Sequence, residues 1–142
     1  ALGAIEAMRD GRRLDPAELE HIYRLKTGCL LRASVLAAAC CAEQVPDTTR
    51  EALERFVDAL GLAFQVRDDI LDIEGTTAET GKTGGSDLAK DKATYPHLSG
   101  MPRARQRADE LLQQATGALA AFGSEYDGLR WAARYIVLRQ RT

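Results

Sequence analysis

The sequence has no uninterrupted apolar run of membrane-spanning length. Its longest apolar stretch, from Cys29 to Ala42, is interrupted by Arg32 and Ser34, and it is shorter than the roughly 20 residues that a transmembrane helix needs. We therefore expect no membrane span. We interpret this stretch as a core helix that packs on several sides.

Cysteine is scarce as well. The 142 residues include three cysteines, which cannot all pair, and the side chains of Cys40 and Cys41 would diverge on a helix. This content argues against a disulfide framework and favours a reducing compartment, the cytoplasm. No signal peptide opens the chain, but Ala1 is not an initiator methionine. We therefore expect the natural N-terminus to be absent, so that native targeting cannot be read from these residues.

A basic surface is missing too. The 19 lysines and arginines are nearly balanced by 21 aspartates and glutamates, and no basic stripe with interleaved aromatic residues occurs, which argues against a nucleic-acid binder. Strand-like alternation and internal repeats are also missing, so neither a sheet nor a solenoid is supported. An all-helical fold remains, and the length suits one compact domain or half of a larger one.

Helix start and stop signals divide the chain into four helices and one long loop. At the first start, Asp15 can act as N-cap, while Pro16 and Glu18 suit the first and third helical positions. Thr48 and Glu51 have the spacing of a second capping box. The predicted helices cover about 16–42, 49–73, 102–123 and 125–139, and a loop rich in Gly, Thr, Lys and Asp covers about 74–96.

An acidic cluster lies near the predicted end of the second helix. Asp68 and Asp72 are four residues apart and share one face with Gln65, whereas Asp69 points about 100° away, where it suits an outer shell. The helix macrodipole disfavours negative charge at this end, and beyond Arg67 no lysine or arginine lies nearby in the sequence. We therefore expect a cation to bind here.

The chemistry of this cluster favours Mg²⁺. Carboxylate oxygens without a neighbouring histidine or cysteine suit this ion, which keeps several waters and binds through one or two carboxylates plus substrate phosphates. A solvated acidic patch is the alternative, and an isolated DDxxD motif does not decide between the two. The apolar face over residues 60–65 favours the metal site, because it places the carboxylates beside a core.

Two further segments can offer cations to a phosphate. Lys26 and Thr27 border the apolar part of the first helix. The alternative for Lys26 is more common: a lysine at such a border usually extends its charged end to solvent and binds no ligand. Gly28 indicates a close approach or a kink. In the loop, Lys82 and Lys92 accompany a glycine-rich segment that lacks the spacing and the preceding strand of a P-loop. A flexible charged loop is the alternative there.

Together these segments resemble bacterial farnesyl diphosphate synthases of the trans-isoprenyl diphosphate synthase family. The resemblance covers about 17–139 and is carried by residues 26–28, 61–65, 68–72, 80–82 and 87–96. It implies an all-α isoprenoid (terpenoid) synthase bundle around a deep apolar cavity, usually a homodimer. Residues 1–142 would form the C-terminal half of that single domain.

The resemblance also implies an activity and roles for individual residues. The activity is the Mg²⁺-dependent condensation of isopentenyl diphosphate with dimethylallyl or geranyl diphosphate, giving a short-chain product, farnesyl diphosphate. The implied roles are metal binding by Asp68, Asp69 and Asp72, diphosphate binding by Lys26, Lys82 and Lys92, and contact of Thr27 and Gln65 with the allylic carbocation.

The family's first aspartate-rich motif, and the arginines that follow it, do not occur in these residues. We therefore expect the chain to be inactive alone and to need an N-terminal half that was cleaved, forms a separate chain or was left out of this one. A longer-chain polyprenyl synthase, a terpene cyclase, a non-catalytic scaffold subunit and a helical bundle without a small-molecule role remain as alternatives. The lysines favour a synthase over a cyclase, and the retained aspartates argue against a scaffold.

Overall fold

The computed structural model describes residues 14–42, 44–80 and 93–139, without the side chains of 76–80. Over these ranges the regular structure is helical and no strand occurs, which confirms the all-α prediction. In the same ranges no helix has both the length and the hydropathy to cross a membrane. The elements are α2 (Pro16–Tyr23), η1 (Arg24–Gly28), α3 (Cys29–Cys40), α4 (Asp47–Thr80), α6 (Tyr95–Ser99), α7 (Met101–Ala118), η2 (Ser124–Tyr126) and α8 (Asp127–Leu138).

The first predicted helix forms as α2, η1 and α3 in one continuous segment. Its capping box is present: Asp15 Oδ1 accepts from the Glu18 N–H at 2.8 Å, and the Glu18 carboxylate accepts from the Asp15 N–H at 3.0 Å. Within this segment η1 is a π-helical turn, in which the Cys29 N–H donates to the Arg24 carbonyl. Such turns bend and widen a helix and are frequent at functional sites.

The second helix is longer than the sequence pattern predicts. α4 begins at Asp47, so Thr48 lies inside the first turn instead of capping it, and the helix continues to Thr80. Both predicted boundaries of the loop are therefore wrong, because 74–80 is helical and Tyr95–Ser99 forms α6. The apolar periodicity stops near Ile73. The helix can nevertheless continue over 74–80, because the one glycine in this segment costs it only about 1 kcal/mol and no proline interrupts it.

The last two helices lie close to their predicted positions. α7 ends at Ala118, five residues before the predicted stop at Gly123, and η2 precedes α8. The Arg130 guanidinium explains this tight connection, because its nitrogens bind the carbonyls of Leu119, Phe122 and Gly123 at 2.7, 2.6 and 2.8 Å. Carbonyls that lose their helical partners at the end of α7 are satisfied in this way.

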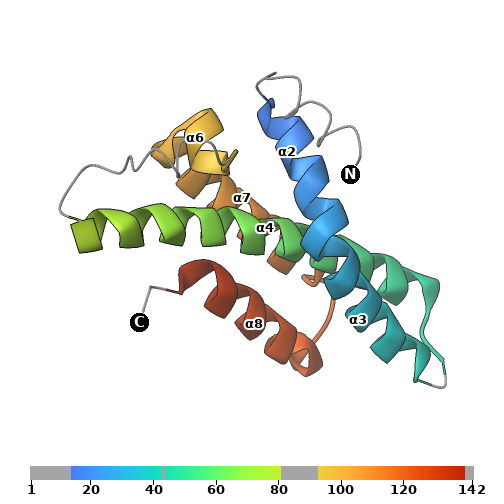
Figure 1. Cartoon of the computed structure of the whole chain (residues 1–142). Coiled ribbons are helices and arrows are strands. Elements are labelled where there is room, and N and C mark those ends of the chain that lie inside the picture. Colours follow the sequence, from blue (N-terminus) through green and yellow to red (C-terminus); the bar gives the residue numbers. More distant parts are fainter. Residues whose placement is uncertain (1–13, 43, 81–92, 140–142) are drawn as a thin grey trace.

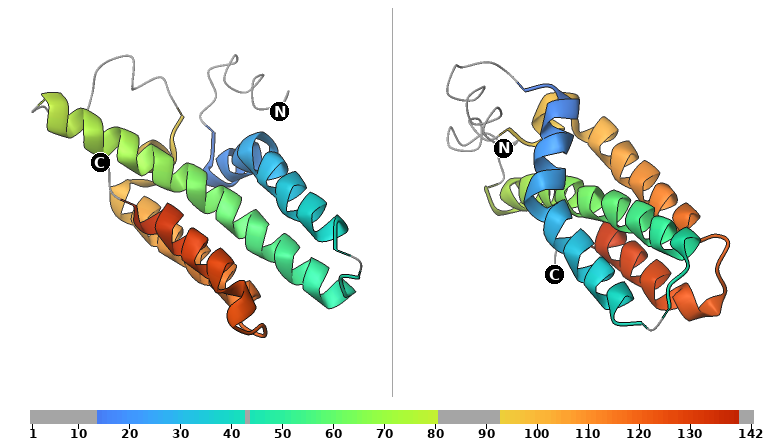
Figure 2. Two further views of the ribbon diagram at one scale, coloured as in Figure 1. Left: turned by 90° about the horizontal axis from the view of Figure 1, so that it is seen from below. Right: turned by 90° about the vertical axis from the view of Figure 1, so that its right-hand side faces the viewer.

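α4 is the central element of the fold. It contacts α2, η1, α3, α6, α7 and α8, and the three views show α3 and α8 beside it while α2 crosses over it (Figure 1, Figure 2). The largest fully buried side chains line α4 and the facing side of α7: Phe56, Val57, Leu62, Val66, Ile70, Leu111 and Leu119. The core thus supports the middle of α4 up to the aspartate-rich segment.

The predicted burial of α3 on several sides is wrong for this chain. Leu30 is 71% exposed, and Ala39 is the one buried residue of α3. A single side of α3 faces α4, where Arg32 forms ion pairs with Glu54 at 2.7 Å and Asp58 at 3.0 Å. Within the described ranges nothing covers the opposite side, which leaves the apolar side chains there in solvent.

The predicted close approach at Gly28 is confirmed. A methyl group added to Gly61 of α4 would lie 3.1 Å from the Cα of Gly28, which is tighter than ordinary van der Waals contact. Both glycines are buried. The absence of a side chain on Gly61 therefore sets how closely α4 approaches the η1 backbone at Gly28.

We expect Gly61→Ala to lower the free energy of unfolding by about 1–3 kcal/mol, because the added methyl group would push on helix backbone that cannot move aside easily. The matched control is Gly28→Ala, whose methyl group would meet neighbours only at 3.8 Å and which should be neutral or stabilising by up to about 1 kcal/mol. Urea denaturation of the two variants measures the difference, and equal stabilities would contradict the close packing.

Candidate functional site

The aspartate-rich segment lies within α4 and not at its end. Asp68, Asp69 and Asp72 precede the last helical residue, Thr80, by at least two turns. Because the macrodipole acts mainly within the last turn, the predicted repulsion between these carboxylates and the helix end does not apply. Asp68 and Asp69 instead have specific hydrogen-bond partners.

Asp69 is held by donors from two other elements. Its Oδ2 accepts a short hydrogen bond from the Tyr23 hydroxyl of α2 and another from the Tyr95 backbone N–H at 2.8 Å. The side chain thus points toward α2 and α6. This orientation agrees with the predicted divergence from Asp68, and it fixes the carboxylate in place.

Burial sets the protonation states of this pair. Desolvation raises the pKa of Asp69 above its ordinary value, the bonds from Tyr23 and Tyr95 lower it, and the nearby Asp68 and Asp72 raise it. The pKa of Tyr23 is raised strongly, first by burial and then by its bond to Asp69. The phenol therefore keeps its proton and remains the donor.

A second network stabilises Tyr95. Its hydroxyl donates to Glu20 Oε1 at 3.2 Å, and the Arg107 guanidinium donates to both oxygens of Glu20 at 2.8 and 3.0 Å. Glu20 and Arg107 are each 16% exposed, so the pair is screened far less than a surface ion pair. The network joins α2, α6 and α7 around the segment that holds Asp69.

Asp68 has a partner that the sequence analysis missed. Arg139, at the end of α8, places Nη2 2.9 Å from Asp68 Oδ1 and its Cζ 4.8 Å from the centre of the Phe64 ring. The Arg139 carbonyl accepts two bonds from the Arg67 guanidinium, at 2.6 and 3.1 Å. No local signal predicts this contact, because it joins residues 71 positions apart.

Lys26, Thr27 and Gln65 lie on neighbouring stretches of two antiparallel helical segments. These stretches lie between two contacts. Tyr23 contacts Asp69 at one end, and Gly28 contacts Gly61 at the other. Lys26 is exposed, whereas Thr27 and Gln65 are partly buried. The fold therefore brings the predicted Lys26–Gly28 segment alongside the helix that carries the aspartates. Lys82 and Lys92 lie outside the described residues.

The donor set of α4 fits a metal that brings other ligands with it. In the described part of the chain, no three His, Cys, Asp or Glu side chains converge on one point as a complete metal site. Asp68 and Asp72 offer carboxylates on one face of a continuous helix, Asp68 is half exposed and Asp72 is exposed. Mg²⁺ needs only one or two carboxylates when waters and phosphate oxygens complete its shell.

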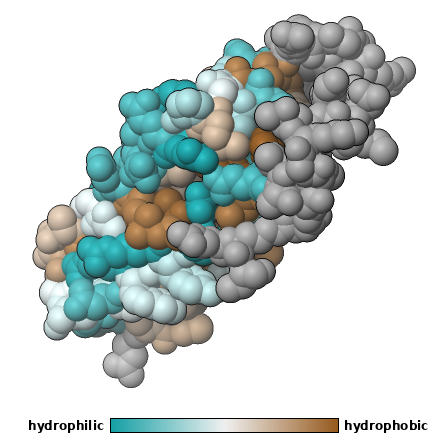
Figure 3. Space-filling model, turned by 90° about the vertical axis from the view of Figure 1, so that its left-hand side faces the viewer, coloured by the Kyte–Doolittle hydropathy of each residue, from teal (hydrophilic) through white to brown (hydrophobic). Residues whose placement is uncertain are grey.

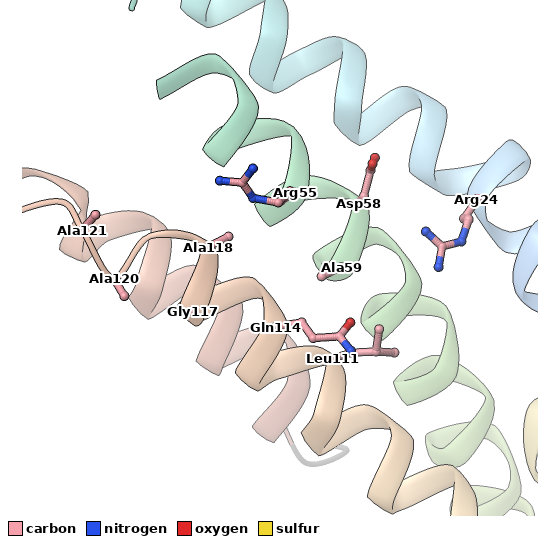
Figure 4. A pocket seen from close by; sticks show the side chains of 10 residues that line it. All are labelled: Arg24, Arg55, Asp58, Ala59, Leu111, Gln114, Gly117, Ala118, Ala120 and Ala121. Carbon is pink, nitrogen blue, oxygen red and sulfur yellow. The ribbon is translucent and has the colours of Figure 1, made fainter. Parts of the chain in front are cut away.

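A groove between α4 and α7 is separate from the surface near the aspartates. A groove of about 680 Å³ lies between α4 and α7 and is lined by Arg24, Arg55, Asp58, Gln114 and small residues of α7 (Figure 4). Asp58 precedes Asp68 by about 15 Å along α4, so this groove is a separate feature. Seen from the side where α4 ends, the surface has apolar patches between hydrophilic residues (Figure 3).

Comparison with known proteins assigns the family. The polyprenyl synthetase family model matches residues 4–125. The chain belongs to the polyprenyl synthetase family. It is 40% identical to a farnesyl diphosphate synthase of Haemophilus influenzae over 96% of this chain and 46% of that protein. For a farnesyl diphosphate synthase of Escherichia coli the identity is 37%, over 97% of this chain and 47% of that protein.

Solved structures agree with this assignment. A crystal structure of a FPP/GFPP synthase from Zymomonas mobilis matches with a TM-score of 0.68 and 35% identity, over 87% of this chain and 38% of that chain. The isoprenoid synthase fold predicted from the sequence is thereby confirmed. The chain spans about half the length of the curated family members that it matches.

We expect Tyr23→Phe to destabilise this polyprenyl synthetase chain by about 1.5–3 kcal/mol, because a partly buried carboxylate would lose one of its two donors. The matched control is Tyr135→Phe, which removes a hydroxyl from a side chain that is 61% exposed and should change stability by less than about 0.5 kcal/mol. Urea denaturation compares the two variants. Equal effects would show that the Tyr23–Asp69 bond does not stabilise the site.

Proposed function

We propose that this chain is the C-terminal half of a Mg²⁺-dependent prenyltransferase of the farnesyl diphosphate synthase type. Together with family membership, the observation that supports the proposal is the packing of η1, which carries Lys26 and Thr27, against α4, which carries the aspartates. Two contacts hold these elements together: Tyr23 contacts Asp69, and Gly28 contacts Gly61. A cation and a metal-binding face on adjacent helices suit a diphosphate group.

In this proposal Asp68 and Asp72 bind Mg²⁺, and Asp69 orients the water ligands from its fixed position. Lys26 binds the allylic diphosphate, with Lys82 and Lys92 as further predicted donors from the loop. When bound, Mg²⁺ supplies electrostatic stabilisation of the departing diphosphate. These roles explain why acidic side chains on α4 accompany a lysine on the neighbouring element η1.

The reaction requires no basic side chain from this chain. The allylic carbon–oxygen bond breaks and its electron pair leaves with the diphosphate. The double bond of isopentenyl diphosphate then forms the new carbon–carbon bond, and the released diphosphate accepts the proton that is lost. The dipoles of Thr27 and Gln65 stabilise the carbocation without trapping it. His97 is engaged with the Thr94 hydroxyl at 2.8 Å, and His21 is exposed.

The helix that carries Lys26 also supports binding of a prenyl chain. Leu30 lies one turn after Lys26 on the same side, and it is 71% exposed. A charged group followed by an apolar side chain matches a substrate with a diphosphate head and a hydrocarbon tail. We propose that this side of η1 and α3 forms one wall of the apolar cavity.

The N-terminal half of the same enzyme is the proposed partner of the uncovered apolar surfaces. α8 exposes Trp131, Tyr135 and Leu138, which follow the i, i+4, i+7 pattern of one helix face, and the rings of Trp131 and Tyr135 stack at 5.2 Å. Exposed apolar faces of this kind mark interaction surfaces. The matched relatives are about twice as long as this chain, which provides an occupant of suitable size.

Farnesyl diphosphate is the proposed product, and a longer prenyl diphosphate is the alternative. The chemistry at the diphosphate would be the same for both products, so the residues described above do not distinguish them. Homodimer formation and a cytoplasmic location belong to the same proposal. The homodimer follows from the resemblance, and the cytoplasmic location follows from the cysteine content.

We expect Asp68→Ala to weaken Mg²⁺-dependent binding of a bisphosphonate to the whole enzyme by more than about 10-fold, because even outer-shell substitutions cost metal sites about 10- to 100-fold. Asp47→Ala is the matched control, since it removes an exposed aspartate from the same helix about 30 Å away. Isothermal titration calorimetry measures both variants. Unchanged affinity in Asp68→Ala would support the scaffold alternative.

Trp131 reports on the proposed partner, because it is the only tryptophan of this chain and is 65% exposed. Addition of an N-terminal half whose tryptophans are replaced by phenylalanine should shift Trp131 emission to shorter wavelength as the ring leaves water. Mixing with an unrelated helical protein is the control. If size-exclusion chromatography showed a complex while the emission stayed unchanged, the N-terminal half would not cover this face of α8.

A further inference from the structure

Arg139 is attached to the aspartate-rich segment in two independent ways. Its backbone carbonyl is held by the Arg67 guanidinium at 2.6 and 3.1 Å. Its side chain separately stacks over Phe64 and donates to Asp68 at 2.9 Å. Because the backbone has its own anchor, the guanidinium can leave Asp68 without detaching the end of α8 from α4.

The guanidinium is incompletely satisfied where it lies. Its Nε is buried and has no hydrogen-bond partner among the described residues, although buried donors are normally paired. The Asp68 side chain is 51% exposed, compared with 27% for Arg139, so solvent and ions can reach the carboxylate. A partly exposed ion pair with one orphaned donor is a weak competitor for a divalent ion.

We propose that Arg139 is the resident counter-ion of Asp68, and that a divalent cation must displace its guanidinium before it can bind this carboxylate. Arg139 neutralises Asp68 and limits repulsion among the three carboxylates while no metal is bound. It thereby sets the metal affinity of the site and acts as a positioning residue. The inference rests on the proposed function, because it requires Asp68 to be a metal ligand.

The test measures Mn²⁺ binding to the whole enzyme in the absence of diphosphate. Electron paramagnetic resonance reports the concentration of free Mn²⁺. Arg139→Gln should bind Mn²⁺ about two- to five-fold more tightly than the wild type, which corresponds to the usual strength of a partly exposed ion pair. Arg139→Lys keeps the charge and should stay close to the wild type. The matched control is Arg134→Gln, which removes an exposed charge from the same helix and should leave the affinity unchanged.

Thermal unfolding provides a second readout, which a merely structural role would not reproduce. Arg139→Gln should lower the Tm in EDTA, where the carboxylates lose their counter-ion, and the deficit should shrink at saturating Mn²⁺. Equal or weaker Mn²⁺ binding by Arg139→Gln, with normal binding by the wild type, would overturn this inference alone. Absence of Mn²⁺ binding by the wild-type enzyme both without and with a bisphosphonate would overturn the proposed function as well.

Discussion

The site depends on the close contact between two antiparallel helical segments, α2–η1 and α4. Facing glycines at positions 28 and 61 bring the backbones together at one end, and the bond from Tyr23 to Asp69 fixes the other end. Two fixed points on nearly rigid helices determine the relative position of all residues between them. The placement of Lys26, Thr27 and Gln65 therefore follows from this contact.

In this region, the residues that hold the helices in place differ from the exposed residues that are proposed to bind ligands. The network of Glu20, Arg107 and Tyr95 has low exposure and joins three helices, whereas Lys26 and Asp72 remain exposed. The exposed residues are the ones for which ligand binding is proposed, and such groups must be able to exchange solvent for a ligand. The polar network around Tyr95 supplies the rigidity that such exposed groups need.

Local signals predicted the helices, and long-range packing explains the failures. Asp15 and Glu18 form a capping box that is complete within four residues, so the sequence is sufficient to predict it. The partner of Asp68 could not be predicted, because Arg139 is 71 residues away and comes near only through the packing of α8. Burial of α3 was predicted from its apolar composition, but composition does not say whether the covering partner belongs to the same chain. Leu30 accordingly remains exposed in the described part of the chain.

Helical geometry accounts for the different roles proposed for the three carboxylates. At spacings i, i+1 and i+4, the first and last side chains share a face and the middle one points about 100° away. Once α2 and α6 cover the direction of Asp69, the helix presents Asp68 and Asp72 together on another side. Burial makes ionisation of Asp69 costly, and two donors offset that cost. The motif therefore needs a tyrosine and a backbone N–H in its surroundings as much as it needs the aspartates, because without them the middle carboxylate would be an uncompensated charge against the core.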